Sequence, residues 1–377
     1  MNNNIRLLQV VPSLNSGGVE QGTVDIAENL IKSGYYSSVV SNGGRLVSLL
    51  EKFGSKHFKF PVHSKNPFII YNNIFNLKKI ILNEKINILH TRSRAPAWSS
   101  YYAGKNKVKL VSTFHNIYGH QNSLKKFYNS GLAKADSIIA ISQFVKENII
   151  KLYNVSEDKI TVIYRGINEK NYNSNNINEK IMLNFISENN IINNNKIILY
   201  PGRLTKWKGQ IEFLKVLKKL KTKNFCCYFV GDNKNRSYAI KLSKEIENFN
   251  LNKKCRIMGH ISDMKYIYKL SDLVVNGSQE PEGFGRVVSE AMCMEKPVIA
   301  YAYGGVAEQL ATQDEMFKIP INDFEKMACS IDKVLNMSKD KINLIGQKSS
   351  TFVKQSFTKD IMTSKTLNLY KRLLNGK

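Results

Sequence analysis

The sequence predicts an α/β protein made of two doubly wound domains, each a parallel sheet between layers of helices. Short apolar runs alternate with amphipathic helical stretches almost from end to end, and strands that alternate with helices form parallel sheets. An Asn-rich stretch at 168–195 interrupts this alternation once. The length of 377 residues also favours two domains, because a single hydrophobic core seldom organises so long a chain.

The first half of the chain supplies the first series of elements. A strand is predicted over Ile5–Val11, and a Gly17-Gly18 loop separates it from a helix over Glu20–Lys32. Helical patterns separate the remaining apolar runs, which predict strands over Ser37–Ser41, Ile86–Arg92, Val108–Phe114, Ser137–Ile141 and Ile160–Ile163. These elements form the predicted N-terminal domain, residues 1–170.

The alternation restarts after the Asn-rich stretch, in which one short helix is predicted over Ile181–Ser187. Apolar runs predict strands over Ile197–Tyr200, Cys226–Val230, Arg256–Met258, Leu273–Val275 and Pro297–Ala300. Helices are predicted from Gly209, over Tyr238–Phe249 and Met264–Leu270, after Gly285, and over Thr358–Leu374. Residues 171–357 are the predicted second domain.

The chain is strongly basic. It has 56 Lys and Arg against 30 Asp and Glu, a formal net charge of +26. Such a charge points to a polyanionic partner: nucleic acid, an anionic membrane surface or a phosphorylated substrate. A composition biased towards Asn, Lys and Ile explains the excess equally well, so the sequence leaves both explanations open.

Other bulk features exclude several classes of protein. The five cysteines include no Cys-x-x-Cys pair, and a disulfide framework does not suit a chain of this size. No apolar run approaches the ~20 residues that span a bilayer, and the N-terminus lacks the plan of a signal peptide. The six histidines show no metal-ligand spacing and there is no Asp-x-Asp, so we expect no metal site. We expect a cytoplasmic protein.

Ligands of open α/β sheets bind outside the carboxyl ends of the strands, so the loops that follow strands are the candidate sites. The first such loop contains Gly17-Gly18, and paired glycines let backbone amides approach an anion at a helix start. The loop matches neither G-x-G-x-x-G nor a P-loop motif. A tight turn explains the pair equally well, so this loop alone is weak evidence.

The second loop opens the first helix of the second domain. It carries two cations, Arg203 and Lys208, between Gly202 and Gly209. Arg forks onto phosphate oxygens and Lys supplies a point charge, so the spacing suits an anion clamp. Solvated surface charge ahead of a helix is the alternative. A clamp of this kind would hold a diphosphate with protein cations in place of a metal.

The third loop, Glu280–Met292, is the most specific. Glu282 lies in the loop and Glu290 about two turns along the helix that follows. Three residues of the loop lie between them: Gly283, Phe284 and Gly285. A loop carboxylate can bind sugar hydroxyls, first-turn amides can hold phosphate, and the helix carboxylate can reach a ribose diol. Either acid can instead be a solvated partner of the helix dipole.

Two further loops follow strands. The segment Thr113–Asn116 places His115 at a strand end, where a structural histidine is the more common outcome; its location still makes it a candidate. Gly304-Gly305 follows the strand over Pro297–Ala300 and places Glu308 in the first turn of a helix.

Together these motifs resemble the family 4 retaining glycosyltransferases of the GT-B fold, over essentially the whole chain. The matching blocks are Gly17–Glu20, Gly202–Gly209, Glu282–Glu290 and Gly304–Glu308. The segment Arg92–Trp98 also looks like that of a bacterial subgroup that includes envelope-polysaccharide transferases. The resemblance implies two Rossmann-like domains that face each other across a cleft.

The resemblance implies roles for the second domain, which would bind the nucleotide sugar. Arg203 and Lys208 would bind the donor diphosphate and stabilise its departure. Glu282 would contact the transferred sugar, and Glu290 the ribose. The same substrate-binding loop would include Gly283, Phe284 and Gly285.

For the first domain, the resemblance implies acceptor binding. Gly17 and Gly18 would close over the donor phosphates, and His115 would lie near the reacting centre as a catalytic residue. Arg165 departs from the commoner Pro-Asn-Gly at that point of the family pattern, so no role is assigned to it. The last helix, at about 358–377, would cross back onto this domain.

The implied reaction is transfer of a hexosyl unit from a UDP- or GDP-linked sugar to a hydroxyl of a glycan or lipid-linked acceptor. The anomeric configuration would be retained by a front-face mechanism without a metal, in envelope-polysaccharide or lipopolysaccharide synthesis. Lys105, Lys107 and Lys109 follow Trp98, and basic residues beside aromatics suit an anionic membrane surface. Peripheral binding to the inner face of the plasma membrane is therefore a further expectation, with biased composition as its alternative.

Two rival functions fit parts of the pattern. A basic nucleic-acid-binding protein would explain the charge, but the basic residues are scattered and no recognised nucleic-acid module is present, so we expect no nucleic-acid partner. A sugar phosphorylase or nucleotide-sugar epimerase of the same fold would share the loops; the Glu282 and Glu290 pair favours a transferase.

Overall fold

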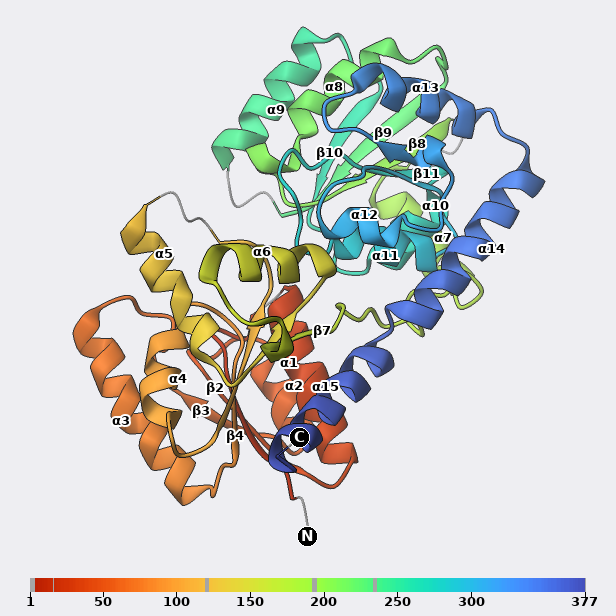
Figure 1. Cartoon of the computed structure of the whole chain (residues 1–377). Coiled ribbons are helices and arrows are strands. Elements are labelled where there is room, and N and C mark those ends of the chain that lie inside the picture. The colour runs from red at the N-terminus through yellow and green to blue at the C-terminus, as the bar shows by residue number, and fades with distance from the viewer. Residues whose placement is uncertain (1–3, 16, 119–121, 192–194, 233–235, 377) are drawn as a thin grey trace. The chain divides into compact units, whose positions relative to one another are not determined.

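The computed structural model divides into two compact units (Figure 1). Unit 1 is Met1–Gly166 together with Lys359–Lys377, and unit 2 is Ile167–Thr358. Each unit is a parallel β-sheet with covering helices, so the predicted α/β class with two doubly wound sheets is confirmed. The structure describes residues 4–15, 17–118, 122–191, 195–232 and 236–376.

Unit 1 contains a seven-stranded parallel sheet in the order β3-β2-β1-β4-β5-β6-β7. The strands are β1 (Arg6–Val10), β2 (Tyr36–Ser41), β3 (Lys56–Lys59), β4 (Ile88–Thr91), β5 (Lys109–Phe114), β6 (Ser137–Ala140) and β7 (Ile160–Val162). The sequence analysis missed β3, because Lys-His-Phe-Lys contains no apolar run. The strand lies at the sheet edge, where it pairs on one side only.

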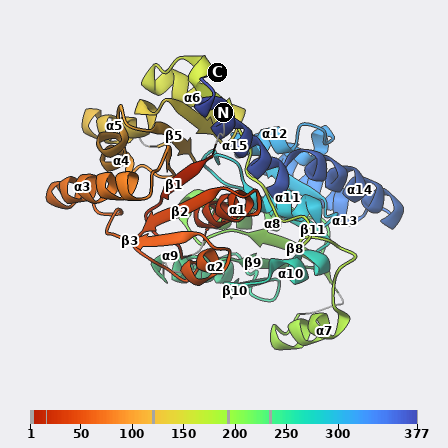
Figure 2. The same cartoon turned by 90° about the horizontal axis from the view of Figure 1, so that it is seen from below.

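The helices of unit 1 connect these strands and form separate groups. They are α1 (Gly18–Lys32), α2 (Val47–Lys52), α3 (Pro67–Asn83), α4 (Ala97–Gly104), α5 (Ser123–Ser130), α6 (Gln143–Tyr153) and α15 (Lys359–Leu374), with 3-10 turns η1 (Gly131–Lys134) and η2 (Glu157–Lys159). Figure 2 shows α3, α4 and α5 gathered on one side of the unit, apart from α1 and α2.

The C-terminal helix α15 is bound to unit 1 by polar and apolar contacts. The Tyr370 hydroxyl hydrogen-bonds to His90 Nδ1 at 2.6 Å, and His90 Nε2 hydrogen-bonds to Thr113 Oγ1 at 2.7 Å. Burial holds the pKa of His90 well below its ordinary value, so this strand histidine is neutral. At the start of the helix, the Lys359 ammonium lies 2.7 Å from the Glu28 carboxylate of α1.

Unit 2 contains a six-stranded parallel sheet in the order β10-β9-β8-β11-β12-β13. The strands are β8 (Lys196–Pro201), β9 (Phe225–Val230), β10 (Cys255–Gly259), β11 (Leu273–Asn276), β12 (Val298–Tyr301) and β13 (Lys318–Ile319). The sequence analysis missed β13, an edge strand of two residues, which is too short to produce a periodic pattern.

The helices of unit 2 follow the prediction closely where a strand precedes them. They are α7 (Glu179–Glu188), α8 (Gln210–Lys219), α9 (Arg236–Asn248), α10 (Met264–Leu270), α11 (Arg286–Cys293), α12 (Gly305–Gln309), α13 (Phe324–Leu335) and α14 (Lys339–Ser356), with 3-10 turns η3 (Lys206–Lys208) and η4 (Glu315–Phe317). The helix predicted from Gly209 begins one residue later, because Gly209 has a left-handed φ of 73°.

Strand order reverses once in each sheet. In unit 1 the reversal falls between β1 and β4, and in unit 2 between β8 and β11. The loops that leave the carboxyl ends of such a pair run to opposite sides of the sheet and open a crevice between them. Within the described ranges, no helix combines the length and apolar character that a bilayer-spanning segment requires.

Candidate active site

The loops after β8 and β11 meet at the strand-order reversal of unit 2. The backbone amide of Gln279 donates to the Trp207 carbonyl at 2.8 Å, and the Tyr200 hydroxyl donates to the Lys208 carbonyl at 2.6 Å. A side chain at Gly209 would collide with the carbonyl of Gly277. Gly209 therefore serves two needs, a left-handed turn and the close approach of two loops.

A buried ion pair joins these two loops. The Lys208 ammonium lies 2.6 Å from Glu282 Oε1, and the two side chains are 10% and 11% exposed. The same oxygen accepts hydrogen bonds from the Ser278 hydroxyl at 2.6 Å and the Asn276 amide at 2.9 Å. Burial favours a raised pKa for Glu282, but the Lys208 charge and these hydrogen bonds lower it below its ordinary value. Glu282 is thus ionised at neutral pH.

The sequence analysis gave Lys208 and Glu282 separate ligand contacts and did not anticipate that they bind each other. It also missed Trp207, which lies between the two predicted clamp cations in the sequence. The Lys208 ammonium is 4.4 Å from the centre of the Trp207 ring, and the Arg203 guanidinium carbon is 5.9 Å from it. Arg203 is exposed. The structure thus brings Arg203, Lys208 and Glu282 together at the carboxyl ends of β8 and β11.

Glu290 lies on α11, buried among polar side chains that the sequence analysis did not predict. Its Oε1 pairs with the Arg286 guanidinium at 3.0 Å, and its Oε2 accepts from the Tyr268 hydroxyl at 3.1 Å. Burial raises the pKa of Glu290, although Arg286 and hydrogen bonds from Tyr268 and Tyr172 oppose the rise. Tyr172 belongs to the Asn-rich stretch that the sequence analysis treated as a break between domains, so no local pattern marked it.

The turn between the two acids is held by a second glycine pair. The amide of Gly305 donates to the Glu282 carbonyl at 2.9 Å, and a side chain at Gly304, which has φ +67°, would lie 2.7 Å from the same carbonyl. Phe284 is buried, with its ring centre 5.3 Å from that of Phe357. The Phe284 side chain is therefore part of the core, and its carbonyl accepts a hydrogen bond from the Gln309 side chain.

In unit 1, the predicted Gly17-Gly18 loop starts α1. Gly17 has a φ of +138°, and a side chain there would lie 2.6 Å from the Glu20 carboxylate. Glu20 therefore folds back towards the helix start. The N-cap residue of α1 is Gly17, which has no side chain to accept hydrogen bonds from the first amides of the helix.

His115, Arg92 and Arg165 each follow a strand of unit 1, and the two arginines act electrostatically on the histidine. Burial, followed by the charges of Arg165 and Arg92, holds the pKa of His115 well below its ordinary value, so its imidazole is neutral. Burial also lowers the pKa of Arg92 to about 10. A side chain at Gly22 of α1 would lie 2.8 Å from the Arg165 guanidinium. The sequence analysis assigned no role to Arg165, which departs from the family pattern, and placed Arg92 only in a segment that resembles a bacterial subgroup.

Metal-ligand residues do not cluster in the part of the chain that the structure describes. Within those ranges, no group of three or more His, Cys, Asp or Glu side chains is placed to hold a metal ion. His120, one of the six histidines of the sequence, lies outside the described residues.

Comparisons with known proteins identify the class. A model described as Glycosyltransferase Family 4 matches residues 16–171, and one described as Glycosyl transferases group 1 matches residues 183–349. A crystal structure of a glycosyltransferase from Rickettsia africae is 37% identical, with a TM-score of 0.91 and 100% coverage of both chains. The chain therefore belongs to the glycosyltransferases. Its two parallel-sheet, Rossmann-like units are those of the GT-B fold. The predicted enzyme class is confirmed.

Two more distant relatives bear on finer questions. The crystal structure of Anabaena Alr3699/HepE in complex with UDP and glucose is 21% identical, has a TM-score of 0.83, and covers 97% of this chain and 99% of its own. The capsular polysaccharide biosynthesis glycosyltransferase CapM of Staphylococcus aureus is 28% identical over 254 residues, 64% of this chain and 62% of CapM. The roles of individual site residues stay predictions.

Breaking the Lys208 and Glu282 pair should destabilise unit 2. Lys208→Met is expected to lower the free energy of unfolding by about 3–5 kcal/mol, because it leaves a buried carboxylate without its cation. The double variant Lys208→Met/Glu282→Gln should lose less than the sum of the two single variants. Urea unfolding followed by circular dichroism measures all three.

The matched control for this cycle is Lys206→Met, an exposed lysine in the same turn, which should change stability little. Single-variant losses that add to within about 0.5 kcal/mol in the double variant would show that the two side chains do not stabilise each other.

Proposed function

We propose that this glycosyltransferase moves a hexosyl unit from a nucleotide-diphosphate sugar to a hydroxyl of a glycan or lipid-linked acceptor, with retention of the anomeric configuration. The observation that carries the proposal is the convergence of Arg203, Lys208 and Glu282 at the strand-order reversal of unit 2. Such a crevice is where α/β sheets bind nucleotides. Two cations there match a diphosphate, and a fixed carboxylate matches sugar hydroxyls.

The contacts around Glu282 support its assignment to the sugar. Among the described residues, its three partners all contact Oε1, which leaves Oε2 to accept hydrogen bonds from sugar hydroxyls. Asn276 ends β11 and Ser278 follows it two residues later, so this one strand end holds the carboxylate in one orientation without the ligand. A group fixed in advance loses less entropy on binding.

The proposed chemistry uses protein cations to stabilise the leaving group. The bond between the anomeric carbon and the phosphate oxygen breaks, the acceptor oxygen bonds to that carbon on the same face, and the acceptor proton passes to the departing phosphate. Negative charge grows on the diphosphate during this step, and Arg203 and Lys208 would neutralise it. This charge stabilisation lets the reaction proceed without a metal ion.

Glu290 of unit 2 and His115 of unit 1 take the remaining proposed roles. We assign Glu290 to the ribose diol, which would compete with the Tyr268 hydroxyl for Oε2. We assign His115 to the substrate near the reacting carbon, where a neutral imidazole can donate or accept a hydrogen bond. The binding of UDP and glucose by HepE supports a UDP-linked donor, and the likeness to CapM supports a role in envelope polysaccharide synthesis.

The nucleotide should bind through Glu290 and respond to pH. In a thermal-shift panel of UDP, GDP, ADP and CMP without metal, one diphosphate should stabilise the wild type by about 2.7 kcal/mol at 100 times its Kd. Because the pKa of Glu290 is raised, protonation removes its acceptor charge at a higher pH than for an ordinary glutamate. Affinity should therefore fall as the pH is lowered from 7 to 5.

Glu290→Gln should bind the nucleotide more weakly at pH 7 and lose this pH dependence. Glu188→Gln, an exposed acid on α7, is the control and should behave as the wild type. If no nucleotide stabilises the wild type, the donor-site assignment is wrong.

Removing the exposed clamp cation should abolish most turnover while leaving the fold intact. Arg203→Ala is expected to lower kcat on the order of 100-fold, because it removes charge stabilisation of the leaving diphosphate. Lys206→Ala, the exposed neighbour, should keep full activity. Activity should survive EDTA, and NMR of the product should show the donor's anomeric configuration.

Near-full activity of Arg203→Ala would contradict the clamp. An inverted product would contradict retention. Formation of a sugar phosphate or of an epimerised donor in the absence of acceptor would favour the phosphorylase or epimerase alternative.

We also propose that unit 1 binds anionic membranes through α3 and α5. Large apolar side chains are exposed on these helices: Phe68, Tyr71, Phe75, Leu82, Leu124 and Phe127. Figures 1 and 2 both place α3 and α5 on the same side of unit 1. Lys79, Lys125 and Lys126 are exposed on the same two helices, and an apolar patch with lysines fits an anionic bilayer surface.

Flotation with liposomes tests this surface. The protein should float with vesicles rich in phosphatidylglycerol and less with phosphatidylcholine, and Phe68→Ser/Phe127→Ser should reduce flotation several-fold. Leu344→Ser, an equally exposed apolar residue on α14 of unit 2, is the matched control. Equal flotation with both lipids would contradict the proposal.

A further inference from the structure

Unit 2 contains a polar cavity at the amino ends of its strands, away from the loops after β8 and β11. The cavity has a volume of about 280 Å³. Lys196 begins β8, Asp272 immediately precedes β11, and Lys296 precedes β12, so these residues mark the amino ends of the strands. The loops that carry Arg203 and Glu282 leave the carboxyl ends. Neither of those residues lines this cavity.

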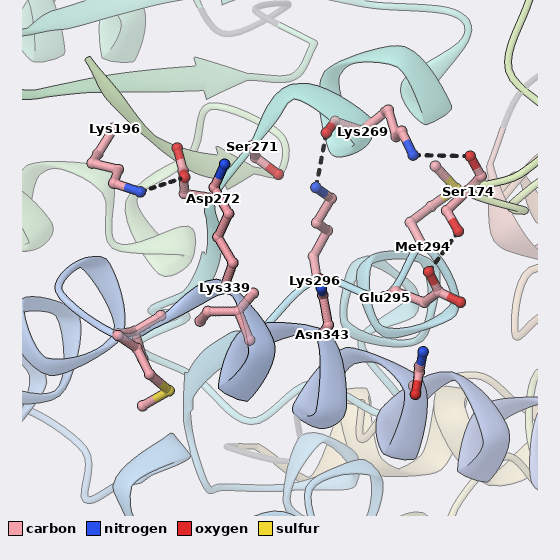
Figure 3. Close-up of a pocket in the computed structure, with 14 residues that line it drawn as sticks. Ser174, Lys196, Lys269, Ser271, Asp272, Met294, Glu295, Lys296, Lys339 and Asn343 are labelled. Atoms are coloured by element: carbon pink, nitrogen blue, oxygen red, sulfur yellow. Dashed lines mark hydrogen bonds and ion pairs between the residues drawn. The ribbon is translucent and has the colours of Figure 1, made fainter. Parts of the chain in front are cut away.

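Four lysines from different elements line the cavity. Lys196 comes from β8, Lys269 from α10, Lys296 from the turn after α11, and Lys339 from the first residue of α14. Figure 3 shows the ammonium groups of Lys196, Lys296 and Lys339 directed into the space between α14 and the strand ends. Like charges gathered around one cavity repel each other unless an anion lies between them.

The two acids of the cavity already have partners. Asp272 Oδ1 binds Lys196 at 3.1 Å, and its Oδ2 accepts from the Ile197 amide at 2.8 Å. Glu295 Oε2 accepts from the Ser174 hydroxyl at 2.6 Å. These bonds hold both carboxylates against the wall of the cavity.

Lys269 and Lys296 bind neutral carbonyls, so no carboxylate of the described residues pairs directly with either ammonium. Asp272 and Glu295 only partly offset the charge of Lys296. The Lys269 ammonium donates to the Ser174 carbonyl at 3.0 Å, and the Lys296 ammonium donates to the Lys269 carbonyl at 2.8 Å. Burial, and then the charge of Lys269, lowers the pKa of Lys296 to about 8. Positive charge is therefore held in the cavity at a cost that a bound anion would remove.

We propose that this cavity is a second anion site of unit 2 and takes a small soluble phosphate monoester, such as a sugar phosphate. Lysine ammonium groups bind phosphate as point charges from several directions. Four uncharged polar side chains also line the cavity: Ser174, which binds Glu295, and Ser271, Asn343 and Gln347, which suit the hydroxyls of a sugar. The volume of about 280 Å³ is just below the range of pockets that take drug-sized ligands, which fits a small ligand.

A bound phosphate would join α14 to the rest of the unit. Lys339 is on α14, whereas Lys296 lies in the turn between α11 and β12, so an anion between them replaces repulsion by attraction. α14 packs on α11, the helix that carries Glu290. The ligand should therefore raise the melting temperature of the protein.

Calorimetry and thermal shift with inorganic phosphate and glucose 6-phosphate test the proposal, with glucose and equal ionic strength of sodium chloride as blanks. Glucose 6-phosphate should bind and stabilise the wild type, and Lys296→Gln and Lys339→Gln should each raise its Kd at least about tenfold, a loss of about 1.4 kcal/mol. Lys348→Gln removes an exposed lysine of α14 that does not line the cavity and should bind as the wild type.

Arg203→Ala separates this site from the nucleotide loops. Binding that persists in Arg203→Ala and is weakened in Lys296→Gln and Lys339→Gln supports the cavity, whether or not any nucleotide binds. Binding weakened in Arg203→Ala alone overturns it, as does the absence of binding up to about 10 mM ligand, where a millimolar site is filled. Binding that requires Lys296 and Lys339 but occurs only on phosphatidic acid vesicles overturns the soluble ligand.

Discussion

The reversal of strand order between β8 and β11 is the constraint on which the chemistry of unit 2 depends. Neighbouring parallel strands normally send their connections to one side, but here the two connections diverge and leave their loops facing a common crevice. The side chains of Arg203, Lys208 and Glu282 are up to 79 residues apart in sequence. They come together at the carboxyl ends of β8 and β11 because these two strands are neighbours in the sheet. The glycines at 209 and 304 then allow the loops to approach.

The ion pair between Lys208 and Glu282 explains how an ammonium and a carboxylate can both be buried at this point of unit 2 without a ligand. A lone ammonium in such a place would carry a large desolvation cost, and so would a lone carboxylate. Each compensates the other, while Trp207 contacts the cation from its ring face. In the proposed function, a bound diphosphate would share the Lys208 ammonium with Glu282 and would not find this ammonium unpaired.

Unit 1 solves a different electrostatic problem. Arg92 and Arg165 are buried near His115, and their charges, added to burial, keep the imidazole neutral. The acids Asp25 and Glu20 of α1 act in the opposite direction on Arg92 and favour its charged form. The start of α1 and the two buried guanidinium groups therefore create a positive potential around His115 in unit 1. No basic motif in the sequence marks this region.

The sequence by itself determined the alternation of strands and helices, the two sheets and the glycine-containing loops that follow the strands, because apolar periodicity and glycine placement are local properties. Edge strands β3 and β13 were missed because pairing on one side demands no apolar run. Only the tertiary structure decided that Lys208 binds Glu282, that Tyr172 and Tyr268 surround Glu290, and that four lysines share a cavity. Those contacts join residues that are far apart in the chain and that the strand order brings together. Strand order cannot be seen in any local stretch of sequence.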